Sequence, residues 1–138
     1  MKRKYVKDPQ AMHRVFSRIS MATPFSTRER LILDLPLRLS FEALKTGQGT
    51  DTDFGDVERA ICISVVRAHE ARPDLEDDAV AGYLAMFRMK ERHNTTGRWG
   101  FDGPALSTVN TALQIHEHFV QCSTPKQMID AGRRLIQA

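Results

Sequence analysis

Helix-start signals recur along this sequence, and each is followed by apolar residues at the spacing of an α-helix. Ser26 and Glu29 have the form of a capping box, and so do Thr124 and Gln127 near the C-terminus. The run Asp102-Gly103-Pro104 places a proline at or near the first position of another helix. Only a few residues separate the predicted helices, which favours antiparallel neighbours. We therefore expect an all-α fold, a small antiparallel bundle of four to five helices over residues 25–138, preceded by a basic N-terminal arm over residues 1–24.

Acidic residues mark the starts of the two middle helices. An N-cap within residues 51–53 precedes an apolar face over residues 57–68. The next helix is predicted to begin near residues 74–78, whose acids suit the positive end of a helix dipole, and to run to about residue 93. The side chains that this helix is expected to bury are Leu75, Ala79, Tyr83, Met86 and Phe87.

The sequence of residues 31–41 fits either a helix or a strand. Leu31, Leu35 and Leu39 have helical spacing, and Gly47 stands where a C-terminal glycine cap belongs. Pro36 opposes a regular helix because it lacks the backbone N–H, and the alternating leucines also fit a half-buried strand. We favour a helix kinked at Pro36, because the signals at both ends agree and no second strand is available for pairing.

The composition is that of a globular domain with a core of its own. The chain has 138 residues, of which 41% are hydrophobic and 27% charged. No apolar run approaches the roughly 18 residues of a membrane span, and the first 24 residues lack the apolar block of a secretory signal. Cys62 and Cys122 are too few for a disulfide framework or a zinc site. We expect a cytoplasmic protein with no membrane association, no metal and no cofactor.

Basic residues gather at two places, separated by an acidic stretch. Residues 1–30 carry a net charge of +6, residues 51–80 carry −6, and residues 81–100 carry +3. Lysine and arginine placed on phosphates release counterions, so a basic arm predicts an anionic partner such as nucleic acid; a solvated tail is the alternative. The arm residues expected to make this contact are Lys2, Arg3, Lys4, Lys7, Arg14 and Arg18.

A glycine-rich loop, residues 97–103, follows the second basic group and contains the only tryptophan, Trp99. An exposed Trp99 beside Arg98 would have the composition of a binding hot spot or of a base-stacking surface. Alternatively, Trp99 and Phe101 close one end of the bundle while Asp102 caps the next helix. The second group of expected contact residues is Arg88, Lys90, Arg92, Arg98 and Trp99, with Trp99 left open between core and contact.

The sequence carries no signature of catalysis. Neither a glycine-rich phosphate loop nor a GxSxG elbow occurs. His116 and His118 are two residues apart on a predicted helix, so their side chains point about 200° apart and are expected to be packed or solvated, not metal-bound. Helix dipoles explain the acids that start the two middle helices. If those two ends lay side by side, they would form a phosphate-like row that mimics nucleic acid.

Three segments resemble short accessory proteins of proteobacterial phages and plasmids, some of which are labelled Fis-type transcriptional regulators. They are the start MKRKYV, the turn Lys45–Thr50 and the segment Thr96–Gly103. The resemblance implies a mobile-element setting. We expect a non-catalytic accessory or regulatory protein, not an enzyme, that binds nucleic acid or a nucleoprotein complex. The alternative is a protein-binding inhibitor of a host defence complex, anti-CRISPR-like or a nucleic-acid mimic. The partner's identity and the oligomeric state, a homodimer included, stay open.

Overall fold

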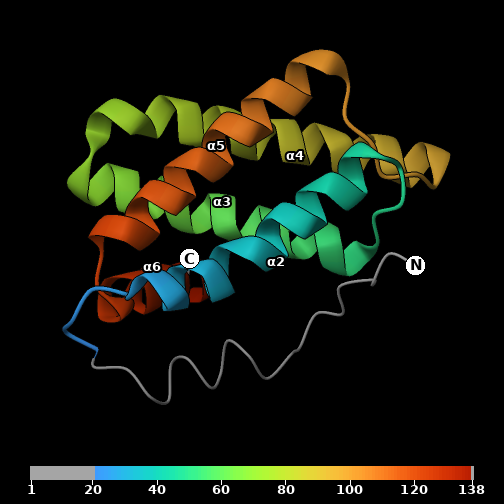
Figure 1. Cartoon of the computed structure of the whole chain (residues 1–138). Coiled ribbons are helices and arrows are strands. Elements are labelled where there is room, and N and C mark those ends of the chain that lie inside the picture. Colours follow the sequence, from blue (N-terminus) through green and yellow to red (C-terminus); the bar gives the residue numbers. More distant parts are fainter. Residues whose placement is uncertain (1–20, 138) are drawn as a thin grey trace, which may run out of the picture.

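A computed structural model describes residues 21–137 of the chain, and Figure 1 shows its ribbon. This part of the chain forms five α-helices, one short 3-10 helix and no strand, so the predicted all-α fold is confirmed. The elements are α2 (Thr27–Lys45), α3 (Asp51–Ala71), η1 (Pro73–Leu75), α4 (Glu76–Thr96), α5 (Gly103–Cys122) and α6 (Pro125–Gln137). Over the same residues, no helix has both the length and the apolar content needed to cross a membrane.

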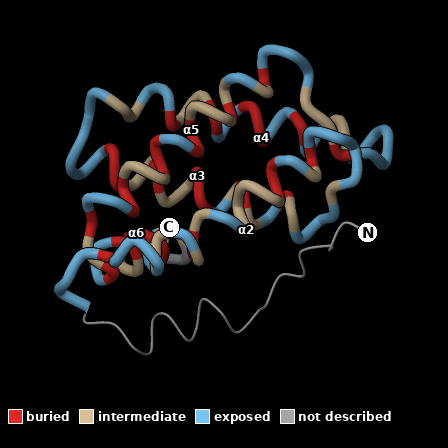
Figure 2. Tube along the Cα trace, viewed as in Figure 1, coloured by how far each residue is buried: buried red, intermediate tan, exposed pale blue. Residues whose placement is uncertain are grey.

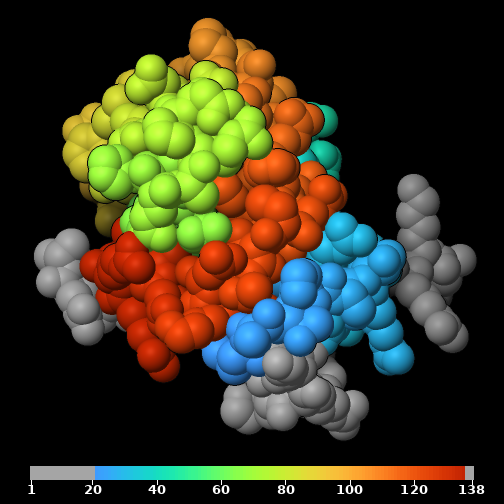
Figure 3. All heavy atoms as spheres, turned by 90° about the vertical axis from the view of Figure 1, so that its left-hand side faces the viewer, coloured from blue at the N-terminus to red at the C-terminus, as the bar shows by residue number. Residues whose placement is uncertain are grey.

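The helices α3 and α4 form an antiparallel pair joined by η1. Helix α5 packs against both of them, α2 packs mainly against α3, and α6 also packs against α3 (Figure 1). The residues before α2 meet the start of α6, where the amide of Lys126 donates a hydrogen bond to the carbonyl of Met21 at 3.1 Å. Figure 3 views this end of the molecule, with the α3–α4 connection in yellow-green, α6 in red and the start of the described chain in blue.

Side-chain caps begin four of the helices. Both predicted capping boxes form: the side-chain oxygens of Ser26 and Thr124 accept hydrogen bonds from the amides three residues further on, at 3.2 Å and 3.3 Å. Asp102 caps α5, as predicted, by accepting from the amide of residue 105 at 2.8 Å. The predicted cap of α3 within residues 51–53 is wrong by one residue. Thr50 is the N-cap, because Thr50 and Asp53 each bind the other's amide in a third capping box.

Residues 31–41 lie within α2, which continues across Pro36, so the helix prediction is confirmed and the strand alternative is wrong. Leu33 and Leu44 are both buried and stand eleven residues apart, which is about three helical turns. Gly47 follows the helix with a φ of +78°, a conformation that glycine adopts without steric strain. The caps and the helical spacing of the core residues together fix the conformation of this segment.

Buried side chains lie along the facing sides of the helices, as the red parts of Figure 2 show. One core cluster joins α2, α3, α4 and α5 and includes Trp99. A second cluster, around Phe119, includes residues of α3, α5 and α6. The helices α4 and α5 approach closely at Gly82, where an added Cβ would lie 2.3 Å from the Cβ of Ala112. Two small residues therefore let these helices pack with little side chain between them.

The predicted buried face of α4 is wrong in part. Ala79 and Met86 are buried as expected, but Tyr83 and Phe87 are 38% and 50% exposed. The reason is the close approach of α5 at Gly82, which selects the side of α4 that carries small residues. Bulky side chains on the other side of the helix then point away from the core.

Candidate functional site

The six basic residues predicted in the arm lie outside the described residues. They are Lys2, Arg3, Lys4, Lys7, Arg14 and Arg18. Residues 1–20 hold these six of the chain's 20 lysines and arginines but only one of its 17 acids, a net charge of +5. Because the whole chain carries +3, residues 21–138 carry a net charge of −2. The first 20 residues therefore account for the positive net charge of the whole chain, and the local +3 of residues 81–100 is outweighed by the acids around it.

Trp99 belongs to the core and not to the surface. Its ring is 8% exposed and is stacked between the rings of His93 and Phe54, at centroid distances of 3.6 Å and 4.3 Å. The indole Nε1 donates a hydrogen bond to Oδ1 of Asp51 at 3.0 Å. Since both faces and the single polar atom are occupied, the predicted role of Trp99 as a base-stacking contact is wrong, and the core alternative is correct.

The loop between α4 and α5 is fixed by contacts at both of its ends. Gly97, with a φ of +73°, ends α4, and its amide donates to the carbonyl of His93 at 2.7 Å. Arg92 donates to Oδ2 of Asp102 at 2.9 Å and to the carbonyl of Gly100 at 3.2 Å. The hydrogen bond from the amide of residue 105, followed by the charge of Arg92, lowers the pKa of Asp102 below its usual value. Arg92 thus holds the loop, which is a different role from the predicted contact with a partner.

Three of the predicted basic contacts are free at the surface. Arg88, Lys90 and Arg98 are exposed, and none of them forms an ion pair with another described residue. The arginines that do form ion pairs are Arg38, Arg67, Arg72, Arg92 and Arg134. Arg88 and Lys90 are two residues apart on α4, so they point about 200° apart around the helix. The structure therefore places Arg88 and Lys90 on two flanks of α4 and not in one patch, and Arg98 lies in the loop that follows α4.

The acidic starts of α3 and α4 do not lie side by side. Helix α3 has 21 residues and is therefore about 31 Å long, and α4 begins beside the end of α3. Asp51, at the start of α3, accepts from Trp99, whereas Asp74, near the start of α4, pairs with Arg72 at 2.7 Å. The predicted phosphate-like row is wrong, because the two acidic groups lie at opposite ends of the helix pair (Figure 1).

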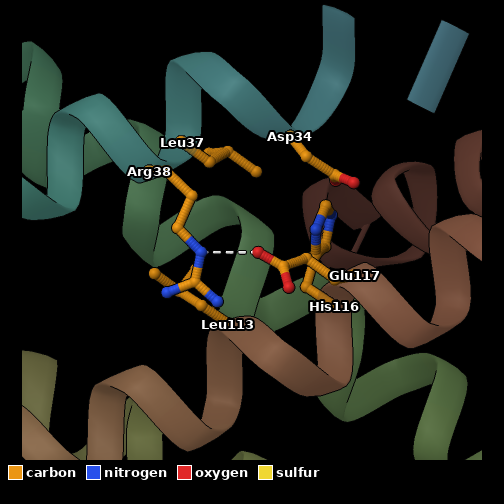
Figure 4. Close-up of a pocket in the computed structure, with 6 residues that line it drawn as sticks. All are labelled: Asp34, Leu37, Arg38, Leu113, His116 and Glu117. Atoms are coloured by element: carbon orange, nitrogen blue, oxygen red, sulfur yellow. Dashed lines mark hydrogen bonds and ion pairs between the residues drawn. The ribbon is translucent and has the colours of Figure 1, made fainter. Parts of the chain in front are cut away.

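A small hollow lies between α2 and α5, and Figure 4 shows its lining. Asp34 and Arg38 come from α2, and His116 and Glu117 come from α5. The guanidinium of Arg38 donates to Oε1 of Glu117 at 2.5 Å and to Oδ1 of Asn110 at 2.7 Å. This ion pair joins two helices that lie far apart in the sequence.

Two polar atoms of the hollow have no hydrogen-bond partner among the described residues, Oδ1 of Asp34 and Nδ1 of His116. Burial, followed by the charge of Glu117, raises the pKa of Asp34 to about 6. Burial lowers the pKa of His116 to about 4, so its imidazole is neutral at physiological pH. The side chains that line the hollow leave no space for a water molecule, so it is a packing feature and not a ligand pocket.

Sequence reasoning missed the charged pair that α2 contributes to this hollow. Asp34 and Arg38 stand four residues apart in a leucine-rich segment and therefore lie on one face of α2. Charged side chains on the half-buried face of a helix indicate a partner on a neighbouring helix. Asp34 and Arg38 give this signal in the sequence, but it does not show that Glu117 is the partner of Arg38.

The described part of the chain contains no group of three His, Cys, Asp or Glu side chains placed to hold a metal ion. His116 lines the hollow, whereas Nε2 of His118 lies 3.7 Å from Sγ of Cys122. The two histidines thus point to different places, as their spacing predicts. Burial, followed by the charge of Glu58, raises the pKa of Cys62 to about 11, which keeps this side chain in the thiol form.

Comparison with protein-family models, with curated proteins and with solved structures finds no match to this chain. The resemblance to phage and plasmid accessory proteins stays a prediction. The charge distribution and the contacts of the described residues are what support a function.

Proposed function

We propose that this protein is a non-catalytic, cytoplasmic accessory or regulatory protein of a mobile element that binds nucleic acid or a nucleoprotein complex. The separation of charge carries this proposal: the first 20 residues carry +5, whereas the remainder carries −2. Basic side chains on phosphates release counterions, so a segment with this charge density is attracted to nucleic acid. The arm is the main contact in this proposal, because the rest of the chain has no positive excess.

Arg88, Lys90 and Arg98 supply further phosphate contacts, and these contacts are separate because Arg88 and Lys90 lie on two flanks of α4. They are exposed and in no ion pair within the described part of the chain, so their charges are available to phosphates. Trp99 and Arg92 are not included, because the first is stacked in the core and the second holds Asp102. Phosphate contacts carry no direct sequence information, so we expect binding to differ little between DNA sequences.

A second candidate function is that of a protein-binding inhibitor of a host defence complex. The net charge of −2 on residues 21–138 favours it, because an acidic domain is attracted to the basic surfaces of nucleic-acid-binding proteins. Capture of partners from a host lysate, with and without nuclease, distinguishes the two candidates. Partners that depend on intact nucleic acid support the first candidate, and a protein that stays bound after nuclease treatment supports the second.

Fluorescence anisotropy of a labelled DNA duplex tests the proposed contact. Replacing the six arm residues by glutamine should weaken binding by about 100-fold or more at low salt, because up to six phosphate contacts are lost. Replacing Arg88, Lys90 and Arg98 by alanine should weaken it by about tenfold. Arg133→Ala is the matched control, since Arg133 is exposed on α6 and in no ion pair among the described residues, and it should leave affinity within about twofold.

Circular dichroism of each variant shows whether the helices are retained. An arm variant that keeps its helix content and binds DNA as tightly as the parent would overturn the proposal. Loss of the helices in the arm variant would show that the arm supports the fold, which also contradicts its assignment as a contact segment.

A further inference from the structure

Helix α4 has an apolar stripe on the side that faces away from the bundle. Tyr83, Leu84 and Phe87 are 38%, 46% and 50% exposed, and Val80 is half-buried. These four residues, which we call the outer face of α4, have the i, i+3, i+4, i+7 spacing of one helix side. The opposite side of α4, around Gly82, already packs against α5. A helix that is apolar on two sides indicates that a second surface covers the outer one.

Charged side chains border the outer face in a complementary order. Asp77 and Arg88 stand eleven residues apart, about three turns, and so lie on the same flank of the stripe. Both are exposed, and neither forms an ion pair with another described residue. Lys90 lies on the other flank near the end of α4, whereas Glu76, four residues before Val80, lies in line with the stripe itself. The Asp77–Arg88 flank is therefore acidic at one end of the helix and basic at the other.

We propose that the outer face of α4 binds the same face of a second copy of this chain, with the two helices antiparallel. In an antiparallel pair, residues on the same flank of the two helices face each other. Placing Asp77 opposite Arg88 of the second copy sets the centre of the pair between Gly82 and Tyr83. This register brings Lys90 to within one residue of the position opposite Glu76, which also contacts His69. The Asp77–Arg88 pair, formed twice by the symmetry of the dimer, sets the register.

The order of charges argues against a parallel arrangement. Parallel copies would bring opposite flanks together, which places Arg88 of one copy beside Lys90 of the other, and like charges at an interface repel. A single helix face lies at or below the roughly 1,200 Å² of buried surface that stable complexes start from. We therefore expect a reversible dimer with a dissociation constant of roughly 1–100 μM. This association does not use the arm, but it shares Arg88 and Lys90 with the proposed further phosphate contacts, so in the dimer these two residues are less available to nucleic acid.

Sedimentation velocity of the full chain without nucleic acid tests the proposal. The parent should shift from monomer to dimer as its concentration rises to about 100 μM. Phe87→Glu should remain monomeric over that range, because it places a charge in the apolar stripe. Leu31→Glu is the matched control: Leu31 is 63% exposed on α2, and its replacement should leave the dimer unchanged.

A charge exchange tests the register. Asp77→Arg and Arg88→Asp should each weaken dimerisation by about tenfold, and the double exchange should restore it, since the pair is then re-formed with its signs reversed. A parent that stays monomeric, a Phe87→Glu variant that still dimerises, or a double exchange that fails to restore the dimer would each overturn the proposal. DNA binding by the six arm residues would be unaffected by these outcomes, so the arm contact and the dimer fail separately.

Discussion

Replacing Trp99 by alanine removes a ring that is stacked on both faces and only 8% exposed. Truncation of a buried tryptophan costs about 3–5 kcal/mol, from lost burial and from the cavity that is left. Domains of this size have unfolding free energies of about 5–15 kcal/mol, so the variant should lose about a fifth or more of its stability. Leu31→Ala, at a position 63% exposed, is the control and should change stability by less than about 0.5 kcal/mol.

Trp99→Phe separates ring packing from hydrogen bonding. Phenylalanine retains an aromatic ring between His93 and Phe54 but has no N–H for Asp51, so we expect a loss of about 1–2 kcal/mol. Urea unfolding followed by circular dichroism measures all three variants. In the parent, emission from Trp99 should be blue-shifted when folded and move to the red on unfolding. A loss below about 1 kcal/mol for Trp99→Ala, or folded-state emission like that of free indole in water, would refute the burial of this ring.

Other predictions concern α4 packing, the proline in α2 and the polar hollow. Gly82→Ala should lower the unfolding free energy by about 1–3 kcal/mol in thermal melts, because its Cβ would lie 2.3 Å from that of Ala112. Pro36→Ala should raise it by about 1 kcal/mol by restoring a helix hydrogen bond, and a marked loss would show that the helix needs this proline. The pKa of Asp34 is raised from 3.8 to about 6 in the folded state, so stability falls as pH rises through that range. Asp34→Asn should therefore stabilise the protein at neutral pH and much less at pH below 3.8. The pKa of His116 is lowered from 6.5 to about 4, so the folded protein loses stability as pH falls through that range. In His116→Leu, the midpoint of urea unfolding should therefore change less over the same pH range. Unchanged pH profiles in both variants would contradict these assignments.

Local signals in the sequence were sufficient to predict most helix starts. The capping boxes at Ser26 and Thr124 and the cap at Asp102 depend on residues within three positions of each other, and all three form. The buried side of α4 could not be predicted in the same way, because α4 carries apolar residues on two of its sides. The contact of Gly82 with Ala112 decides between them, and that contact joins two helices.

The candidate site was predictable only where it depends on charge. The concentration of basic residues in the arm is a property of the sequence and needs no structure. The role of Trp99 depends on Phe54, which lies 45 residues earlier in the chain and which spacing alone could not place beside it. Likewise, the pairing of Arg38 with Glu117 and the separation of the two acidic helix starts follow from how the helices are packed.

The salt dependence of DNA binding separates phosphate contacts by the arm from other modes of binding. The logarithm of the association constant should fall linearly with the logarithm of salt concentration, with a slope of about −0.9 for each phosphate contacted. The steepest slope expected for the parent is about −8, which corresponds to phosphate contacts by all six arm residues and by Arg88, Lys90 and Arg98. Replacing the six arm residues by glutamine should make the slope shallower by about 5. A parent slope near zero, or a slope that the arm replacement leaves unchanged, would contradict binding through the arm.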